Sequence, residues 1–151
     1  MLNFNLFHKK TIHLFSVFVL TLFLGSCASL PEATPIVKRY CVGQGGGFTG
    51  EYKEYSFSED GKVYKRDFVY DRDVYYKDLS AVDLDYFLNQ IRDLGIEFEE
   101  INQPGNMSKY IDIRVNETSK NKITWGAPNY NPPTDIKKLF NELYNKLAER
   151  P

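Results

Sequence analysis

The sequence predicts an α+β domain in which two helices pack on one face of a single antiparallel sheet of about five strands. Three observations support this fold class. The first half of the domain alternates β-branched and aromatic residues with polar ones, as strands do. Two later segments place apolar residues three and four positions apart, which is the spacing of an amphipathic helix. Two more alternating segments lie between these helices, so the expected order is βββ-α-ββ-α.

Residues 1–26 have the organisation of a bacterial signal peptide. Lys9 and Lys10 supply a basic start, and an apolar run from 12 to 24 follows them. The run leads into Leu24-Gly25-Ser26-Cys27. This tetrapeptide resembles a lipobox, the site at which a diacylglyceryl group is attached to a cysteine before the signal peptide is removed. The sequence therefore predicts a lipoprotein with Cys27 as its lipidation site.

A transmembrane anchor is the structural alternative for the same segment. Such a helix needs about 20 apolar residues to cross the hydrocarbon core. The apolar run here is shorter and contains His13, Ser16 and Thr21. Without Cys27 ordinary secretion would be expected, and with it lipid anchoring is favoured.

Lipidation divides the chain into three parts. Residues 1–26 are expected to be removed, residues 27–35 to form the lipidated cysteine and a short tether, and residues 36–151 to form a single domain. Each buried methylene of an acyl chain such as palmitate contributes about 0.8 kcal/mol, so two or three chains give lasting attachment to membrane lipid. Ala28 after the lipidated cysteine favours the outer membrane, with the domain facing the periplasm or the cell surface.

The first three strands are predicted over Ile36–Val42, Glu51–Phe57 and Lys62–Tyr70. Ser58-Glu59-Asp60-Gly61 separates the last two, and its Asp-Gly pair is typical of a tight hairpin turn. The glycine cluster from Gly43 to Gly50 is expected to end the first strand.

Part of this cluster matches the G-x-G-x-x-G pattern of nucleotide-binding loops: Gly45, Gly46, Gly47, Phe48, Thr49 and Gly50. Dinucleotide binding needs a helix directly after the glycines, whereas Glu51–Phe57 alternates like a strand. A kinase glycine loop does join two strands, but the chain lacks the H-R-D and D-F-G motifs of kinases. We therefore predict a bent strand connection that serves as a candidate binding loop, because loops on a rigid scaffold often carry recognition.

The remaining elements follow from capping and periodicity. Ser80 is the predicted N-cap of the first helix and Gly95 its C′ residue. Met107–Val115 and Asn121–Trp125 are predicted strands, preceded by a turn at Gln103-Pro104-Gly105-Asn106. Thr134 is predicted to cap the second helix, whose apolar stripe is Ile136, Leu139, Phe140, Leu143 and Leu147.

Composition excludes several classes of site. Both histidines, His8 and His13, lie in the segment that is removed, so the domain has no imidazole for Ser-His or Cys-His catalysis or for histidine-based metal sites. Loss of Lys9 and Lys10 changes the net charge from −1 to −3, which argues against nucleic-acid binding. The acidic residues form neither a calcium loop nor a recognisable catalytic pair. No metal or cofactor is predicted.

Cys41 is the one cysteine left after Cys27, so the domain cannot contain an intrachain disulfide. Its apolar, strand-like surroundings favour a small buried residue. A reactive or intermolecularly paired thiol is the alternative.

The order of elements and one short motif resemble the emfourin-like inhibitors of thermolysin-type metallopeptidases. The matching residues are Gly46-Gly47-Phe48-Thr49-Gly50, then Leu79 to Leu94, then Tyr110-Ile111-Asp112-Ile113. The chain departs from that family in its lipoprotein signal, in the extended aromatic strand from Lys62 to Tyr76 and in the proline-rich loop before the last helix. The resemblance implies peptidase inhibition but assigns no inhibitory residue.

The sequence thus predicts a membrane-anchored lipoprotein of the cell envelope with a non-catalytic binding or accessory domain. All eleven tyrosines belong to the domain, and tyrosine is frequent at recognition surfaces as well as in half-buried strands. Inhibition of a thermolysin-like metallopeptidase is the alternative, and carboxylate-based hydrolysis is a third hypothesis. The expected partners are membrane lipid, through acylated Cys27, and an envelope protein or peptidase.

Overall fold

The structure, a computed structural model, describes residues 36–150. The predicted signal peptide, the lipobox with Cys27 and the tether lie outside the described residues. Within 36–150, no helix is both long enough and apolar enough to span a membrane.

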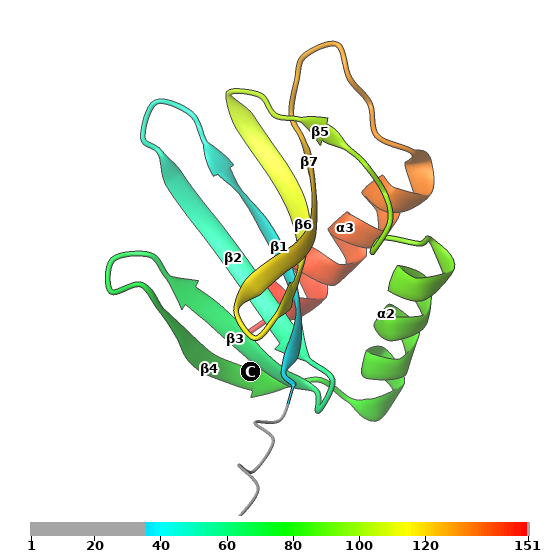
Figure 1. The fold of residues 1–151 in the computed structure, drawn as a ribbon. Coiled ribbons are helices and arrows are strands. Elements are labelled where there is room, and N and C mark those ends of the chain that lie inside the picture. Colours follow the sequence, from blue (N-terminus) through cyan, green and yellow to red (C-terminus); the bar gives the residue numbers. More distant parts are fainter. Residues whose placement is uncertain (1–35, 151) are drawn as a thin grey trace, which may run out of the picture. The chain divides into compact units, whose positions relative to one another are not determined.

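The described chain folds into one mixed sheet and two helices (Figure 1). The sheet has seven strands in the order β4-β3-β2-β1-β6-β7-β5. The long central strands β1, β2, β6 and β7 run antiparallel, and β5 joins the edge of β7 in parallel. The strands are β1 (Lys38–Gly46), β2 (Glu51–Ser58), β3 (Lys62–Asp67), β4 (Arg72–Asp78), β5 (Asn102–Gln103), β6 (Met107–Val115) and β7 (Thr118–Trp125).

The α+β class is confirmed, and the count of about five antiparallel strands is wrong in detail. The segment expected to be one aromatic strand from Lys62 to Tyr76 is a hairpin of β3 and β4. Its turn contains neither glycine nor proline: Asp71 adopts a positive φ of 50°, and the Asp67 carboxylate accepts hydrogen bonds from the backbone N–H groups of Val69 and Tyr70. The other additional strand, β5, overlaps the start of the predicted turn at 103–106.

The N-terminus of one helix is capped by a side chain, and that of the other is not. In α2 (Ala81–Asp93), the Ser80 hydroxyl accepts a hydrogen bond from the Asp83 N–H at 3.1 Å, and Gly95 follows with a φ of 60°, as predicted. In α3 (Thr134–Ala148), Pro133 is the N-cap residue and makes no side-chain cap bond. The prediction that Thr134 caps α3 is therefore wrong, because Thr134 is already its first helical residue.

The hydrophobic core lies between one face of the sheet and the two helices, which Figure 1 shows on the same side. Strand pairing places Tyr40 beside Phe57 and Ile113, and Val42 beside Tyr55 and Ile111, so these side chains share the helix-facing side. Helix α3 contributes the predicted stripe, all of it buried: Ile136, Leu139, Phe140, Leu143 and Leu147.

The alternate residues of the same strands face the side without helices. On β1 these residues are Arg39, Cys41 and Gly43. The strand register places Asp112 of β6 beside Cys41, and Glu54 of β2 beside Gly43. We call this side the open face. Glu54 and Asp112 are nevertheless 3% and 2% exposed, so the open face carries buried charge.

Candidate functional site

The candidate binding loop forms the tip of the β1–β2 hairpin. Strand β1 continues through Gly45 to Gly46, so the glycine cluster does not end the strand at Gly43 as expected. The turn itself follows, with Gly47 at a φ of 72°. The side chain of Phe48 projects from this turn and is fully exposed, at 107% of its reference area.

Packing accounts for a glycine at position 43. The ring of Tyr110 on β6 lies directly over Gly43, and a Cβ there would overlap the ring atoms. A side chain at this position would have to displace the ring from the open face. Gly43 therefore makes room for a tyrosine, and no helix follows the glycines to form a nucleotide-binding site.

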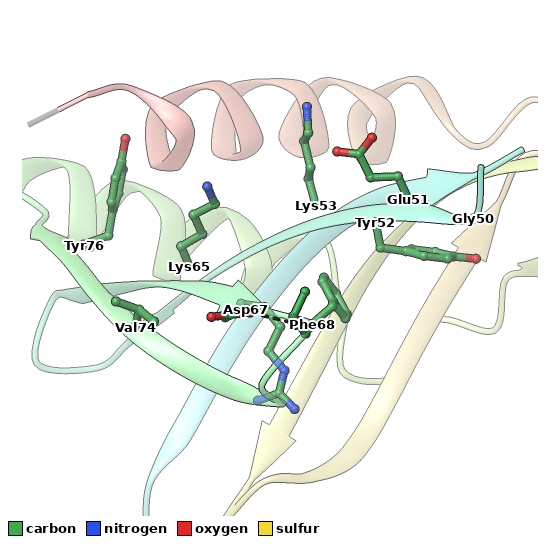
Figure 2. A pocket seen from close by; sticks show the side chains of 11 residues that line it. Gly50, Glu51, Tyr52, Lys53, Lys65, Asp67, Phe68, Val74 and Tyr76 are labelled. Atoms are coloured by element: carbon green, nitrogen blue, oxygen red, sulfur yellow. Dashed lines mark hydrogen bonds between the residues drawn. The ribbon is translucent and has the colours of Figure 1, made fainter.

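A groove separates the β1–β2 hairpin from the β3–β4 hairpin (Figure 2). The two hairpins pair only at Tyr55 with Lys65, Ser56 with Tyr64, and Phe57 with Val63. Beyond Tyr55 the residues Glu51–Glu54 remain paired with β1 alone. The hollow between the diverging strands has a volume of about 610 Å³, within the range of ligand sites. It is lined by Gly50, Glu51, Tyr52, Lys53, Lys65, Arg66, Asp67, Phe68, Val69, Val74 and Tyr76.

The groove has two chemically different walls. Lys53 and Lys65 lie on the α3 side, since they share a face with the core residue Tyr55. Figure 2 shows both lysines and Tyr76 pointing toward this side, with Tyr52 on the opposite side of β2. There the rings of Tyr52 and Phe68 approach each other, with centroids 6.1 Å apart. One wall is thus cationic and the other aromatic.

The tips of both hairpins expose large apolar side chains beside this groove. Phe48 belongs to the β1–β2 tip, and Phe68, Val69 and Tyr70 belong to the β3–β4 tip. Val69 is 84% exposed and Tyr70 71%. Clustered exposed apolar and aromatic side chains mark interaction sites more often than scattered ones do.

Two of the charged residues that line the groove, Arg66 and Asp67, already have partners. Arg66 is paired with Asp71 and Asp73, and Arg72 with Asp67. The ion pairs and side-chain hydrogen bonds among residues 36–150 include neither Lys53 nor Lys65. The cationic wall therefore carries two unpaired ammonium groups. It also carries the carboxylate of Glu51, near the loop.

A second polar group lies on the open face, which we call the Glu54 cluster: Glu54, Tyr110, Asp112, Arg114 and Ser119. The Arg114 guanidinium donates two hydrogen bonds to the Glu54 carboxylate, both 2.8 Å, and its Nε donates to Asp112 at 2.8 Å. The Tyr110 hydroxyl donates to Glu54 at 2.6 Å, and the Ser119 hydroxyl donates to Asp112 at 2.6 Å.

The Glu54 cluster is built for stability and not for proton transfer. Burial, reinforced by the hydrogen bond to Glu54, raises the pKa of Tyr110 well above its usual value. Burial opposes the charge on Arg114, but its bonds to Glu54 more than compensate and raise the pKa of the guanidinium. Both oxygens of each carboxylate accept a hydrogen bond, so both buried acids have partners.

Three of the acidic residues that carboxylate-based hydrolysis could use have basic partners. Asp71 and Asp73 are held by arginines, and Glu97 is paired with Lys38 and Lys120. The buried acids Glu54 and Asp112 were not singled out by sequence reasoning. For Asp112 the signal was present in β6, where Tyr110, Asp112 and Arg114 alternate with apolar residues on a strand long enough to be central.

Cys41 lies on the open face beside Ser56 and Asp112 and is completely buried, as predicted. Burial raises the pKa of its thiol, which keeps the thiol protonated and unreactive at neutral pH. Among residues 36–150, no group of three or more acidic, cysteine or histidine side chains is arranged to hold a metal ion.

The segments that resemble emfourin-like inhibitors occupy three parts of the structure: the β1–β2 tip, helix α2 and strand β6. Only Gly46–Gly50 among them borders the groove, through Gly50. A comparison with protein-family models finds no family that matches the chain, and a comparison with curated proteins finds no match either.

Proposed function

We propose that this protein is a membrane-anchored lipoprotein of the cell envelope whose domain binds a partner protein and has no catalytic role. The observation that carries the proposal is the pair of hairpin tips, which expose Phe48, Phe68, Val69 and Tyr70. The two hairpins flank one groove, which Gly50 of the first tip and Phe68 and Val69 of the second help to line. Such side chains are costly to leave exposed unless a partner covers them, and aromatic anchors dominate binding energy at interfaces.

The position of these tips suits recognition at a distance from a membrane. The described chain begins beside Lys38, the first residue of β1, and the β1–β2 tip follows Gly46 at the other end of that strand (Figure 1). A strand of this length spans about 30 Å at roughly 3.3 Å per residue. The β1–β2 tip and Lys38 thus lie at opposite ends of β1.

Mass spectrometry of the native protein tests the anchor. We expect a mature chain that begins at Cys27 and carries diacylglyceryl and acyl groups. A Cys27→Ser variant should retain residues 1–26 and lose its stable attachment to membranes. An unmodified chain that still carries Met1 would refute the lipoprotein assignment.

Site-specific photo-crosslinking in cells tests the binding surface. A photoreactive residue at Phe48 or at Val69 should crosslink to the same partner, because both tips border one groove. Val82 on α2 is 79% exposed and serves as the matched control on a different surface. Equal crosslinking from Val82, or none from either tip, would contradict the proposed surface.

Inhibition of a thermolysin-like metallopeptidase is a second candidate function, and the exposure of Phe48 favours it. A fully exposed phenylalanine on a glycine-framed loop is able to insert into an apolar pocket of another protein. Titration of a thermolysin-like enzyme with the full chain should then reduce its activity, and Phe48→Ala should restore it. Full peptidase activity at micromolar protein would remove this candidate.

A further inference from the structure

We infer that the groove between the hairpins receives an extended acidic segment of a partner protein, which is added as a strand to the free edge of β2. This inference rests on the proposed binding function and specifies the chemistry of the partner. Three features of the groove carry it: an unpaired strand edge, two walls of different chemistry, and a surplus of positive charge.

The first feature is the edge of β2. Residues Glu51–Glu54 are fixed in a strand by their pairing with β1, while their other side faces the groove because β3 has diverged. Alternate residues of this segment direct their backbone N–H and C=O groups away from β1 and into the groove. A row of unpaired backbone groups on a rigid strand is the template used in strand addition.

The second feature is the alternation of the walls. An added strand would point successive side chains to opposite sides, as every strand does. Side chains on one side would meet Lys53 and Lys65, and side chains on the other would meet Tyr52 and Phe68. The matching segment therefore alternates acidic residues with apolar ones.

The third feature is the charge that the fold leaves unpaired. Lys53 and Lys65 outnumber Glu51 on the cationic wall, whereas Arg66 and Asp67 in the same groove are engaged in ion pairs. A basic segment would face two like charges, with Glu51 as the one opposite charge on that wall. Cross-strand pairs of opposite charge stabilise a sheet, and like charges placed opposite each other destabilise it.

Lysines also protect exposed strand edges against self-association, and this alternative makes a different prediction. If edge protection were the sole role of Lys53 and Lys65, no peptide would bind at the groove. Their removal would instead cause the protein to associate with itself.

Peptide binding to the full chain in detergent separates the two roles. The probe is a blocked peptide of about eight alternating glutamate and valine residues, and its counterpart has lysine in place of glutamate. We expect the acidic peptide to bind and the basic one to bind at least about tenfold more weakly, as two exposed charge pairs allow. The double variant Lys53→Glu/Lys65→Glu should reverse this preference.

The matched control is Lys137→Glu/Lys138→Glu, which changes the same charge on the exposed side of α3 and should leave the preference unchanged. Should the charge-reversal variant fail to fold, Lys53→Gln/Lys65→Gln provides the same test with loss of preference as the expected result. Hydrogen exchange should show new protection of the amides between Glu51 and Glu54 when the acidic peptide is bound.

The inference is overturned if neither peptide binds, or if the Lys53→Glu/Lys65→Glu variant still prefers the acidic peptide. It is also overturned if the amides of Glu51–Glu54 stay unprotected when the acidic peptide is bound. The crosslinking experiment distinguishes this failure from failure of the proposed function. A partner that crosslinks to Phe48 and Val69 without protecting the edge of β2 would leave the binding domain intact and remove only strand addition.

Discussion

The Glu54 cluster and the groove share strand β2, but they differ in whether their polar side chains have partners. Glu54 is buried and its carboxylate is surrounded by donors from Tyr110 and Arg114. Lys53, the preceding residue, points to the other side of the sheet and has no partner among the described residues. One residue step along β2 thus separates a satisfied polar site from an open one.

This difference distinguishes polar side chains that stabilise the fold from polar side chains that are free to contact a ligand. A buried polar network is stable only when every member has a partner, so its residues are unavailable to a ligand. Exposed groups without partners cost the fold little, and they remain available for recognition. We therefore propose that the Glu54 cluster serves stability and that the groove serves binding.

Removal of Glu54 is expected to give the largest effect on stability. Glu54→Ala removes two of the hydrogen bonds of the partly buried Arg114 guanidinium and the partner of the buried Tyr110 hydroxyl, and should lower the free energy of unfolding by about 3 kcal/mol. Urea denaturation measures the loss. Glu51→Ala is the control on the same strand and should change stability by less than about 0.5 kcal/mol, since Glu51 is exposed. Equal losses would show that the Glu54 cluster does not stabilise the fold.

A methyl group at Gly43 tests the packing of the same cluster. Gly43→Ala places a Cβ against the ring of Tyr110 and should cost about 1–3 kcal/mol, because the ring must leave its place beside Glu54. In the double variant with Tyr110→Ala the clash is absent, so the added methyl should cost much less there. Thermal unfolding of the four proteins gives this coupling directly. Identical costs in the two backgrounds would contradict the close approach.

The helices and the long strands could be predicted from the sequence because their patterns are local. Ser80 begins α2 through its side-chain hydroxyl and Gly95 ends it through its positive φ, and the stripe from Ile136 to Leu147 needs only the period of a helix. The β3–β4 turn escaped prediction because aspartates at 67 and 71 form it without the usual glycine or proline.

The candidate site was predictable only in part. The glycine loop and Phe48 were identified from the sequence, since glycines signal an irregular strand connection wherever they occur. The groove depends on where the pairing of β2 with β3 ends, at Tyr55 and Lys65, and no local pattern encodes that point. The approach of Tyr52 to Phe68 likewise follows from the tertiary arrangement of two hairpins.

Changes at the hairpin tips should affect binding and change stability little. Phe48→Ala removes a fully exposed ring and should shift the free energy of unfolding by less than about 0.5 kcal/mol. Phe68→Ala removes a half-exposed ring that approaches Tyr52 and should shift it by less than about 1 kcal/mol. Affinity for the crosslinked partner should fall about tenfold for either variant, as expected for an aromatic anchor. Isothermal titration with that partner provides the measurement. Val82→Ala should leave the affinity as it is, and a comparable loss there would mean that the tips are not the binding surface.

A small effect on stability is expected from the ion pair between Asp60 and Lys62, which is exposed to solvent, unlike the ion pairs of the Glu54 cluster. Hydrogen bonds from Lys62 and Ser58 lower the pKa of Asp60 from 3.8 to about 2, at the turn between β2 and β3. Because the folded pKa is depressed, the stabilisation is present above pH 4 and is lost as the pH falls from 4 toward 2. Asp60 is half exposed, so solvent screening should reduce the contribution to less than about 1 kcal/mol.

Asp60→Asn should therefore lower the free energy of unfolding slightly at pH 7 and by much less at pH 2, while Glu54→Ala lowers it severalfold more at pH 7. Denaturation curves at the two pH values measure both differences. If Asp60→Asn proved as costly as Glu54→Ala at neutral pH, ion pairing alone would explain the Glu54 cluster. The expected difference between the two variants would instead show that burial gives the Glu54 cluster its larger stabilising effect. The carboxylates of Glu54 and Asp60 accept comparable hydrogen bonds and differ mainly in their access to water.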